Sequence, residues 1–161
     1  MYQRNWKDAW SVALTYAVQF TFFPGVMLEY QFSFIPNFSW FVIVVVTYAS
    51  VGDTIGRWLA GKKDLISKPS LLGVCLARGA FFTVAYMLTF EGIWPKFFGS
   101  QVFVIVMLGL FSLSCGYLAT IAMKYGSDAS TVHQGLAGTI MGIHLSFGIS
   151  LGSTLAIAFL S

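Results

Sequence analysis

The sequence predicts an all-α integral membrane protein with five transmembrane helices. Hydrophobic residues make up 57% of the chain and charged residues only 9%, whereas soluble domains carry about 25% charged residues. Five apolar runs reach the length of about 20 residues that a helix needs to cross about 30 Å of hydrocarbon. The runs are too long for barrel strands and do not alternate apolar with polar residues, so helices must be the spanning elements. The lipid bilayer is therefore the expected surroundings of this chain.

Short connections separate the apolar runs. The first run is too long for the apolar core of a signal peptide and is followed by further spans, so we expect it to remain as a membrane helix. The segments "EYQFSFIPN", "GKKDLISKP", "EGIWPKFFG" and "KYGSDASTVH" each contain Pro, Gly or clustered Ser, Asp and Asn residues, which end helices. One membrane domain is predicted over residues 1–161. Its spans are expected, in order, at residues 9–28, 38–60, 70–90, 100–123 and 135–160.

The basic residues of the short connections predict the orientation of the chain. Lys and Arg gather in cytoplasmic loops. With five spans, the segments on one side of the membrane contain a single basic residue, Lys96. The N-terminus is therefore predicted to lie inside and the C-terminus outside. The basic residues on the predicted inner side are Arg4, Lys7, Lys62, Lys63, Lys68 and Lys124.

Span two contains two charged residues in "YASVGDTIGRWLAG". Asp53 and Arg57 are four residues apart, so on a helix they share a face and can form an ion pair. Intramembrane charges are costly unless they face protein or water, and they commonly mark a substrate or ion path. The alternative is that Arg57 extends to the lipid headgroups and Asp53 only neutralises it. Span three adds another intramembrane cation, Arg78.

Glycines four residues apart predict close packing of helices. Span two contains Gly52 with Gly56, and span five contains two such pairs, with a packing partner either in this chain or in another. Span five also contains His144, which would either relay protons or stay neutral and hydrogen-bond to a neighbouring helix. The glycine pairs on span five are Gly138 with Gly142 and Gly148 with Gly152.

Several function classes find no support in the sequence. The basic residues form no sustained basic face, so no nucleic-acid partner is expected. Cys75 and Cys115 lie in apolar runs without metal-ligand spacing, so we expect no metal or other cofactor. The chain contains no phosphate-binding loop, HExxH motif, nucleophile elbow or pair of catalytic carboxylates. It is therefore not predicted to be an enzyme.

The motif around the charged pair resembles that of the equilibrative nucleoside transporters, in which one C-terminal helix reads roughly Phe-Asn-x-x-Asp-x-x-Gly-Arg. Asp53, Gly56 and Arg57 match at the same spacing. The segments "TYAVQFTFFPGV", "LARGAFFTVAYML", "FSLSCGYLATIAMKYG" and "QGLAGTIMGIHLSFGISLG" resemble neighbouring helices of that family. The likeness follows the family's seventh to eleventh helices in order and covers nearly the whole chain. Ser50 and Cys115 stand where the family has asparagines.

The resemblance implies a fold and a site. The fold would be the C-terminal half of a major-facilitator-type helical bundle, and family members move nucleosides or nucleobases by alternating access. Asp53 would accept hydrogen bonds from a sugar, and Arg57 would donate to the ligand. Ser50 would bond the ligand with shorter reach than asparagine, and Arg78 is carried over either as a ligand contact or as a structural residue.

Transporters of this kind rock two bundles around a site between them, and this chain resembles one bundle. Three alternatives follow. The chain is a fragment of a longer transporter, or a half-transporter that pairs with itself or a second chain, or a shortened relative kept as a structural subunit of a larger membrane complex. In the third case Asp53 and Arg57 would act as an interhelical clamp.

Overall fold

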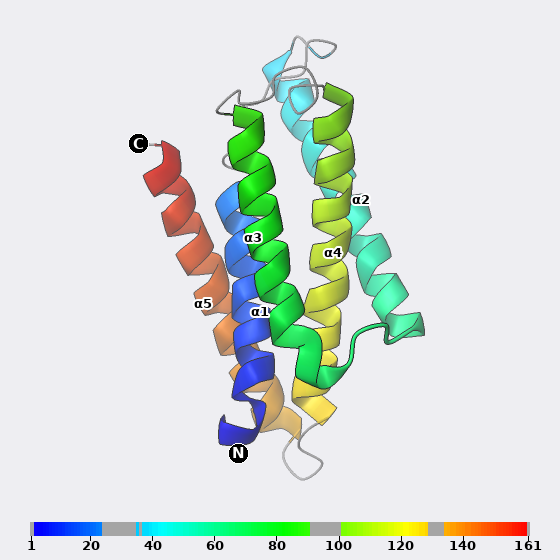
Figure 1. Cartoon of the computed structure of the whole chain (residues 1–161), viewed down its shortest axis with the longest axis vertical. Helices are drawn as coiled ribbons and strands as arrows, with labels where there is room; N and C mark the ends of the chain where they lie inside the picture. The colour runs from blue at the N-terminus through cyan, green and yellow to red at the C-terminus, as the bar shows by residue number, and fades with distance from the viewer. Residues whose placement is uncertain (1, 24–34, 36, 91–100, 129–133, 161) are drawn as a thin grey trace.

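The computed structural model describes residues 2–23, 35, 37–90, 101–128 and 134–160. Within these residues the fold is all-α, as predicted, with five α-helices and one short 3₁₀ helix (Figure 1). Each α-helix overlaps one predicted span. The elements are α1 (Tyr2–Phe22), α2 (Phe38–Lys62), η2 (Lys68–Ser70), α3 (Leu71–Phe90), α4 (Gln101–Asp128) and α5 (Gln134–Leu160).

The largest difference from the predicted spans is at the start of the chain. Helix α1 begins at Tyr2 rather than at residue 9, and the end of the predicted span, residues 24–28, lies outside the described residues. The early start takes in Lys7 and Asp8, which the apolar criterion excluded from the span. In the described part of the chain, three helices are long and apolar enough to cross a membrane by length and hydropathy: Phe38–Lys62, Gln101–Ser127 and Gly135–Ala158.

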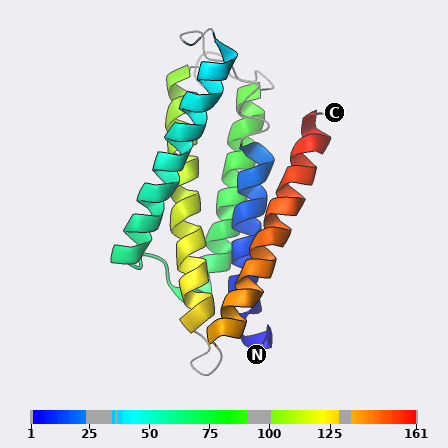
Figure 2. The same cartoon turned by 180° about the vertical axis from the view of Figure 1, so that it is seen from behind.

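Four helices form a row in the order α2, α4, α1 and α5, in which each packs against the next. Helix α3 packs on α1 and α4 from one side of this row, and none of the described helices lies on the opposite side (Figures 1 and 2). We call these two sides the α3 side and the open side. Helix α1 begins and helix α5 ends at opposite ends of the bundle (Figure 1).

Close contacts at glycine hold the row together at two interfaces. A Cβ on Gly56 of α2 would meet the carbonyl oxygen of Leu113 on α4, and a Cβ on Gly116 of α4 would meet that of Asp53. Gly148 and Gly152 of α5 stand in the same way against backbone of α1. These contacts require residues without a side chain, because any Cβ would separate the helices.

Two of the other predicted packing glycines have open space. A Cβ on Gly52 would lie 3.1 Å from the Cβ of Ser112, a tight but adjustable contact. Around Gly138 and Gly142 no described atom lies within 4 Å of the position a Cβ would take. A packing role for this last pair stays a prediction and would need a partner other than the described part of the chain.

The connection between α2 and α3, residues 63–67, is tied to α4. The Tyr117 hydroxyl donates to the carbonyl oxygen of Lys63 at 3.1 Å and accepts the backbone N–H of Leu65 at 2.7 Å. Tyr125 donates to the carbonyl oxygen of Ile66 at 2.8 Å. These bonds fix the path of the chain from α2 across the end of α4 to α3.

Two ion pairs reinforce the same end of the bundle. Lys124 Nζ of α4 lies 2.7 Å from a carboxylate oxygen of Asp64. Lys68 Nζ lies 3.1 Å from a carboxylate oxygen of Asp8, whose side chain is only 3% exposed. Both acidic groups near this connection are therefore already neutralised by lysines.

Candidate functional site

Asp53 and Arg57 form the ion pair that their spacing predicts. Arg57 donates from Nε to Oδ2 of Asp53 at 2.6 Å, one helical turn away on α2. The Arg57 side chain is 44% exposed and that of Asp53 is 27% exposed. The pair thus has a charge-assisted hydrogen bond and still keeps accessible polar atoms.

The pair reaches across the row to α1. Arg57 donates from Nη2 to the hydroxyl oxygen of Tyr16 at 3.1 Å. Tyr16 is buried, and its ring stacks on Phe20 one turn further along α1. Because α4 separates α2 from α1 in the row, the Arg57 side chain must pass over α4 to make this contact.

The pair lies on the open side of the row. Leu59 of α2 borders a cavity on the α3 side. Two residues correspond to about 200° around an α-helix, so Arg57 faces away from that cavity. Asp53 is four residues from Arg57 and shares its direction.

Tyr16 was not predicted as a site residue. The segment "TYAVQFTFFPGV" resembles a helix of the family, and the tyrosine within it carries no signal of its own. Its role depends on the distance between α1 and α2, which periodicity within one helix does not encode. The one sequence feature that could have indicated this contact is a tyrosine on the helix before α2, since a phenolic hydroxyl accepts hydrogen bonds from a guanidinium.

Ser50 lies near the pair on α2. Positions 50, 53 and 57 have the spacing i, i+3, i+7, which places them on one stripe of a helix. Ser50 is exposed, and its hydroxyl donates to the carbonyl oxygen of Val46 at 2.8 Å. The hydroxyl oxygen retains acceptor capacity toward the open side.

Arg78 belongs to a different environment. It is 7% exposed and makes no ion pair within the described part of the chain. Its guanidinium donates from Nε to Ser114 Oγ at 2.8 Å and from Nη2 to Gln19 Oε1 at 3.1 Å. Nη2 also donates to the carbonyl oxygen of Phe111 at 3.0 Å, and Nη1 approaches that of Thr15 at 3.5 Å. Arg78 thereby connects α3 to both α1 and α4.

Aromatic rings cover the buried guanidinium. The Arg78 Cζ atom lies 4.6 Å from the ring centre of Phe111 and 5.6 Å from that of Phe82. Such contacts stabilise a cation that has left water. The structure therefore brings Asp53, Arg57 and Ser50 together on α2 but does not bond Arg78 to them.

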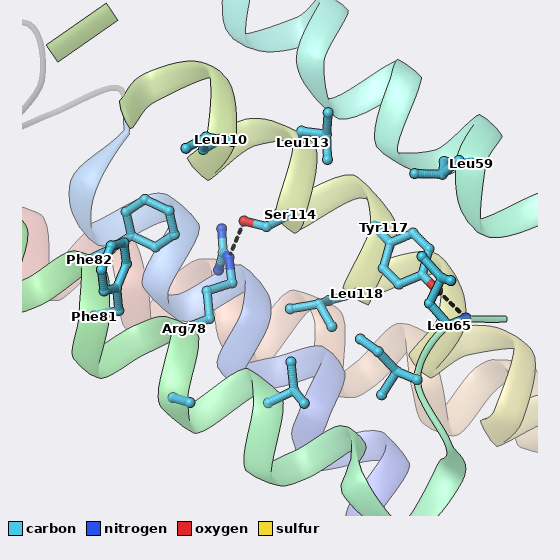
Figure 3. Close-up of a pocket in the computed structure, with 13 residues that line it drawn as sticks. Leu59, Leu65, Arg78, Phe81, Phe82, Leu110, Leu113, Ser114, Tyr117 and Leu118 are labelled. Atoms are coloured by element: carbon cyan, nitrogen blue, oxygen red, sulfur yellow. Dashed lines mark hydrogen bonds between the residues drawn. The ribbon is translucent and has the colours of Figure 1, made fainter. Parts of the chain in front are cut away.

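Arg78 forms part of the wall of a cavity of about 480 Å³ on the α3 side. Figure 3 shows Arg78 directed at Ser114 and Tyr117 directed at the backbone of Leu65, so these polar groups are bonded to the protein. The rest of the wall is apolar. It comprises Leu59, Leu65, Ile66, Val74, Ala77, Phe81, Phe82, Leu110, Leu113 and Leu118.

His144 of α5 bonds within its own helix. Its Nδ1 lies 2.9 Å from the carbonyl oxygen of Ile140, and its ring meets that of Trp10 edge to face with 5.7 Å between ring centres. These contacts orient the imidazole against α1. A proton-relay role for His144 stays a prediction.

An apolar helical bundle in which α2, α4 and α5 are long and apolar enough to cross a membrane defines a class of protein, the integral membrane proteins. Comparison with known families makes the assignment specific. The family described as "Nucleoside transporter" matches residues 2–160, so the chain belongs to the nucleoside transporter family. The predicted resemblance is confirmed.

Individual relatives support the same assignment. The chain is 28% identical over 145 residues to "Equilibrative nucleotide transporter 8" of Arabidopsis thaliana, covering 88% of this chain and 36% of that protein. It is 25% identical over 160 residues to the human "Equilibrative nucleoside transporter 4", covering 94% and 28%. With "Adenosine transporter 1" of Crithidia fasciculata it shares 24% identity over 156 residues, covering 91% and 30%. The chain spans about a third of the length of these curated relatives. They are transporters rather than enzymes.

Proposed function

We propose that this chain supplies the C-terminal half of a nucleoside or nucleobase transporter that works by alternating access. The other half comes from the rest of a longer polypeptide, from a second chain or from another copy of this one. Transporters with two bundles place the substrate between them, near the middle of the membrane. The open side of the α2–α4–α1–α5 row is the face that we assign to this contact.

The observation that carries the proposal is the Asp53–Arg57 pair on the open side, which is partly exposed and is held from α1 by Tyr16. Arg57 occupies one oxygen of Asp53, and the other oxygen is left to accept hydrogen bonds from sugar hydroxyls. Arg57 retains donors on Nη1 for acceptor atoms of the ligand. Ser50 adds a short hydroxyl on the same stripe. The set therefore offers both donors and acceptors, which a nucleoside requires.

In this proposal Tyr16 and Arg78 hold the site in place. Tyr16 fixes the direction of the Arg57 guanidinium, and Arg78 fixes α3 against α1 and α4. We assign Arg78 to the scaffold because its donors are directed at protein acceptors. Gly56 and Gly116 let α2 approach α4 closely enough for Arg57 to reach Tyr16.

A second candidate function is a structural subunit of a larger membrane complex. The bond from Arg57 to Tyr16 favours it, because the same contact that positions a ligand-binding arginine also clamps α1 to α2. The two candidates differ in what the exposed atoms of the pair do. In the transporter they bind substrate, and in the subunit they only hold helices.

Substrate binding tests the transporter directly. We expect Asp53→Asn to lower both nucleoside uptake by cells that express the chain and equilibrium binding to the purified chain by about tenfold or more. This is the loss expected for hydrogen bonds to a charged group. Asp64→Asn is the matched control, since Asp64 is also paired with a cation but lies at the end of the bundle. Unchanged binding by Asp53→Asn with intact membrane insertion would remove Asp53 from the site.

The native particle mass separates the two candidate functions. Particles from the source are resolved in mild detergent, and the polypeptide in each is weighed by mass spectrometry. A polypeptide well above 17.7 kDa, or a small particle of two halves, supports the transporter. An intact 17.7 kDa chain found only in a very large complex supports the structural subunit and contradicts the transporter.

A further inference from the structure

An apolar groove follows α4 on the α3 side, with α2 opposite it in one part and α3 and the α2–α3 connection opposite it in the other. The cavity beside Arg78 and a second cavity of about 320 Å³ lie next to each other, because Leu110 and Leu113 line both. The second cavity extends the groove along α2 to Tyr48. From Tyr48 to Leu59 the groove follows α2 for about 16 Å at 1.5 Å per residue, close to the depth of one leaflet of the bilayer. We call it the α2–α4 groove.

The groove is suited to an unbranched apolar chain. The polar groups in the wall of its larger part, on Arg78, Ser114 and Tyr117, are bonded to protein atoms (Figure 3). A nucleoside in the groove would leave its own polar groups without partners, which is unfavourable. The groove also lies on the opposite side of the row from Arg57. It is therefore separate from the proposed substrate site.

Two lysines with no acidic partner among the described residues lie at the end of α2, beside the groove. Lys62 and Lys63 form no ion pair within the described residues, whereas Lys68 and Lys124 are paired with Asp8 and Asp64. Lys63 also supplies a carbonyl oxygen to Tyr117, a residue of the groove wall. The two ammonium groups are thus the available positive charge beside the groove.

A tryptophan marks the same level. Trp58 is exposed, and Lys62 Nζ lies 4.0 Å from the centre of its ring. Trp58 and Lys62 each follow a groove residue, Ile55 and Leu59, by three positions, which places them beside the groove on a helix. Tryptophan is enriched at the level of lipid headgroups. The predicted orientation puts this end at the cytoplasmic leaflet, which carries the anionic lipids.

We propose that the α2–α4 groove binds one acyl chain of an anionic phospholipid whose phosphate is held by Lys62 and Lys63. The apolar length of the groove indicates an acyl chain, and Trp58 at its rim indicates the level of the headgroups. Lys62 and Lys63, which form no ion pair among the described residues, indicate a negatively charged headgroup. The site does not depend on the proposed transport function.

Fluorescence quenching by brominated lipids tests the site. A full-length chain that keeps only Trp58 is reconstituted in phosphatidylcholine vesicles containing acyl-brominated phosphatidylglycerol or brominated phosphatidylcholine. We expect the anionic lipid to quench Trp58 preferentially, and the preference to fall about fivefold for each lysine removed by Lys62→Gln or Lys63→Gln. The matched control is a chain that keeps only Trp40, at the other end of α2, which should be quenched equally by both lipids. Equal quenching of Trp58 by both lipids would overturn the proposal.

Two further arms separate the acyl chain from the charge. Ile55→Phe fills the groove without altering the lysines and should abolish the preference, whereas Val46→Phe on the open side should keep it. A preference that survives Ile55→Phe would show attraction to a basic surface only and would reject the groove. Excess inorganic phosphate should leave the preference in place, and its loss would instead identify a site for free phosphate. Circular dichroism of each variant checks that the helices are retained.

Discussion

Two arginines on helices of this chain, Arg57 of α2 and Arg78 of α3, are satisfied in different ways. Arg57 has a carboxylate partner on its own helix and a side chain that is 44% exposed on the open side. Arg78 has no carboxylate partner among the described residues, is 7% exposed and donates to four protein acceptors on α1 and α4. The first arrangement leaves polar atoms of the arginine accessible, and in the second the guanidinium donors are bonded to the protein.

The difference teaches how to separate a binding arginine from a scaffold arginine. An ion pair at the surface of a bundle contributes little to stability, so its presence in an apolar helix calls for another role. A buried cation that joins three helices contributes through the acceptors that it satisfies, and removing it takes a donor from each of them. Substitution of Arg78 should therefore lower stability more than ligand binding, and substitution of Arg57 should lower ligand binding more than stability.

The largest effect is expected for Arg78→Leu. Removing the guanidinium deprives Ser114, Gln19 and the carbonyl oxygen of Phe111 of a donor, so we expect the free energy of unfolding to fall by about 3–5 kcal/mol. Thermal unfolding of the purified chain in detergent should show a decrease of roughly 10 °C.

Arg57→Leu is the matched control for that experiment. It should shift the melting temperature far less than Arg78→Leu, because the side chain is 44% exposed and its ion pair joins two residues of the same helix. Equal loss of stability in the two variants would break the distinction between scaffold and site.

Close packing beneath the pair should give the next largest effect. In Gly56→Ala, the new Cβ would meet the carbonyl oxygen of Leu113 and lie 2.8 Å from the backbone nitrogen of Tyr117. Helix α2 must move away from α4, at about 1–3 kcal/mol, and Arg57 is then drawn away from Tyr16. We expect lower stability and weaker nucleoside binding together.

Gly73→Ala provides the comparison for Gly56→Ala. No described heavy atom lies within 4 Å of a Cβ on Gly73 of α3, and alanine favours a helix over glycine by about 1 kcal/mol. Its melting temperature should be unchanged or higher. A fall in stability for Gly73→Ala equal to that of Gly56→Ala would mean that glycine itself, and not the helix contact, matters.

Sequence reasoning reached the helices and the local pair but not the contacts between helices. The apolar runs predicted each α-helix because lipid demands a long apolar stretch, and the spacing of Asp53 and Arg57 predicted their bond because both lie on one helix. The partner of Arg57 on α1 and the acceptors of Arg78 depend on which helices are neighbours. That order, α2–α4–α1–α5 with α3 to one side, is set by tertiary packing and leaves no periodic trace in the sequence.

The sequence pattern also failed to predict where α1 begins and which glycines pack closely, for physical reasons. The early start of α1 was missed because Lys7 and Asp8 interrupt the apolar pattern, and the bond between Asp8 and Lys68 that shields this carboxylate joins residues 60 positions apart. Glycine spacing marked Gly56 and Gly148 without distinguishing them from Gly138, which has open space. The spacing is identical in all three, and only the neighbouring backbone separates them.

The smallest effect, and the sharpest test of the comparison, is expected for Tyr16→Phe. The substitution removes only the hydroxyl that accepts from Arg57 and keeps the ring that stacks on Phe20. If Tyr16 orients Arg57 toward a ligand, nucleoside affinity should fall about fivefold, at the lower end of the range for a hydrogen bond to a charged group because Arg57 is half exposed. Tyr125→Phe deletes the same group at the α2–α3 connection and should leave affinity unchanged. Equilibrium binding separates an orienting role of Tyr16 from a purely structural one. If Tyr16 only joins α1 to α2, Tyr16→Phe would lower the melting temperature, but the folded chain would bind the nucleoside with unchanged affinity.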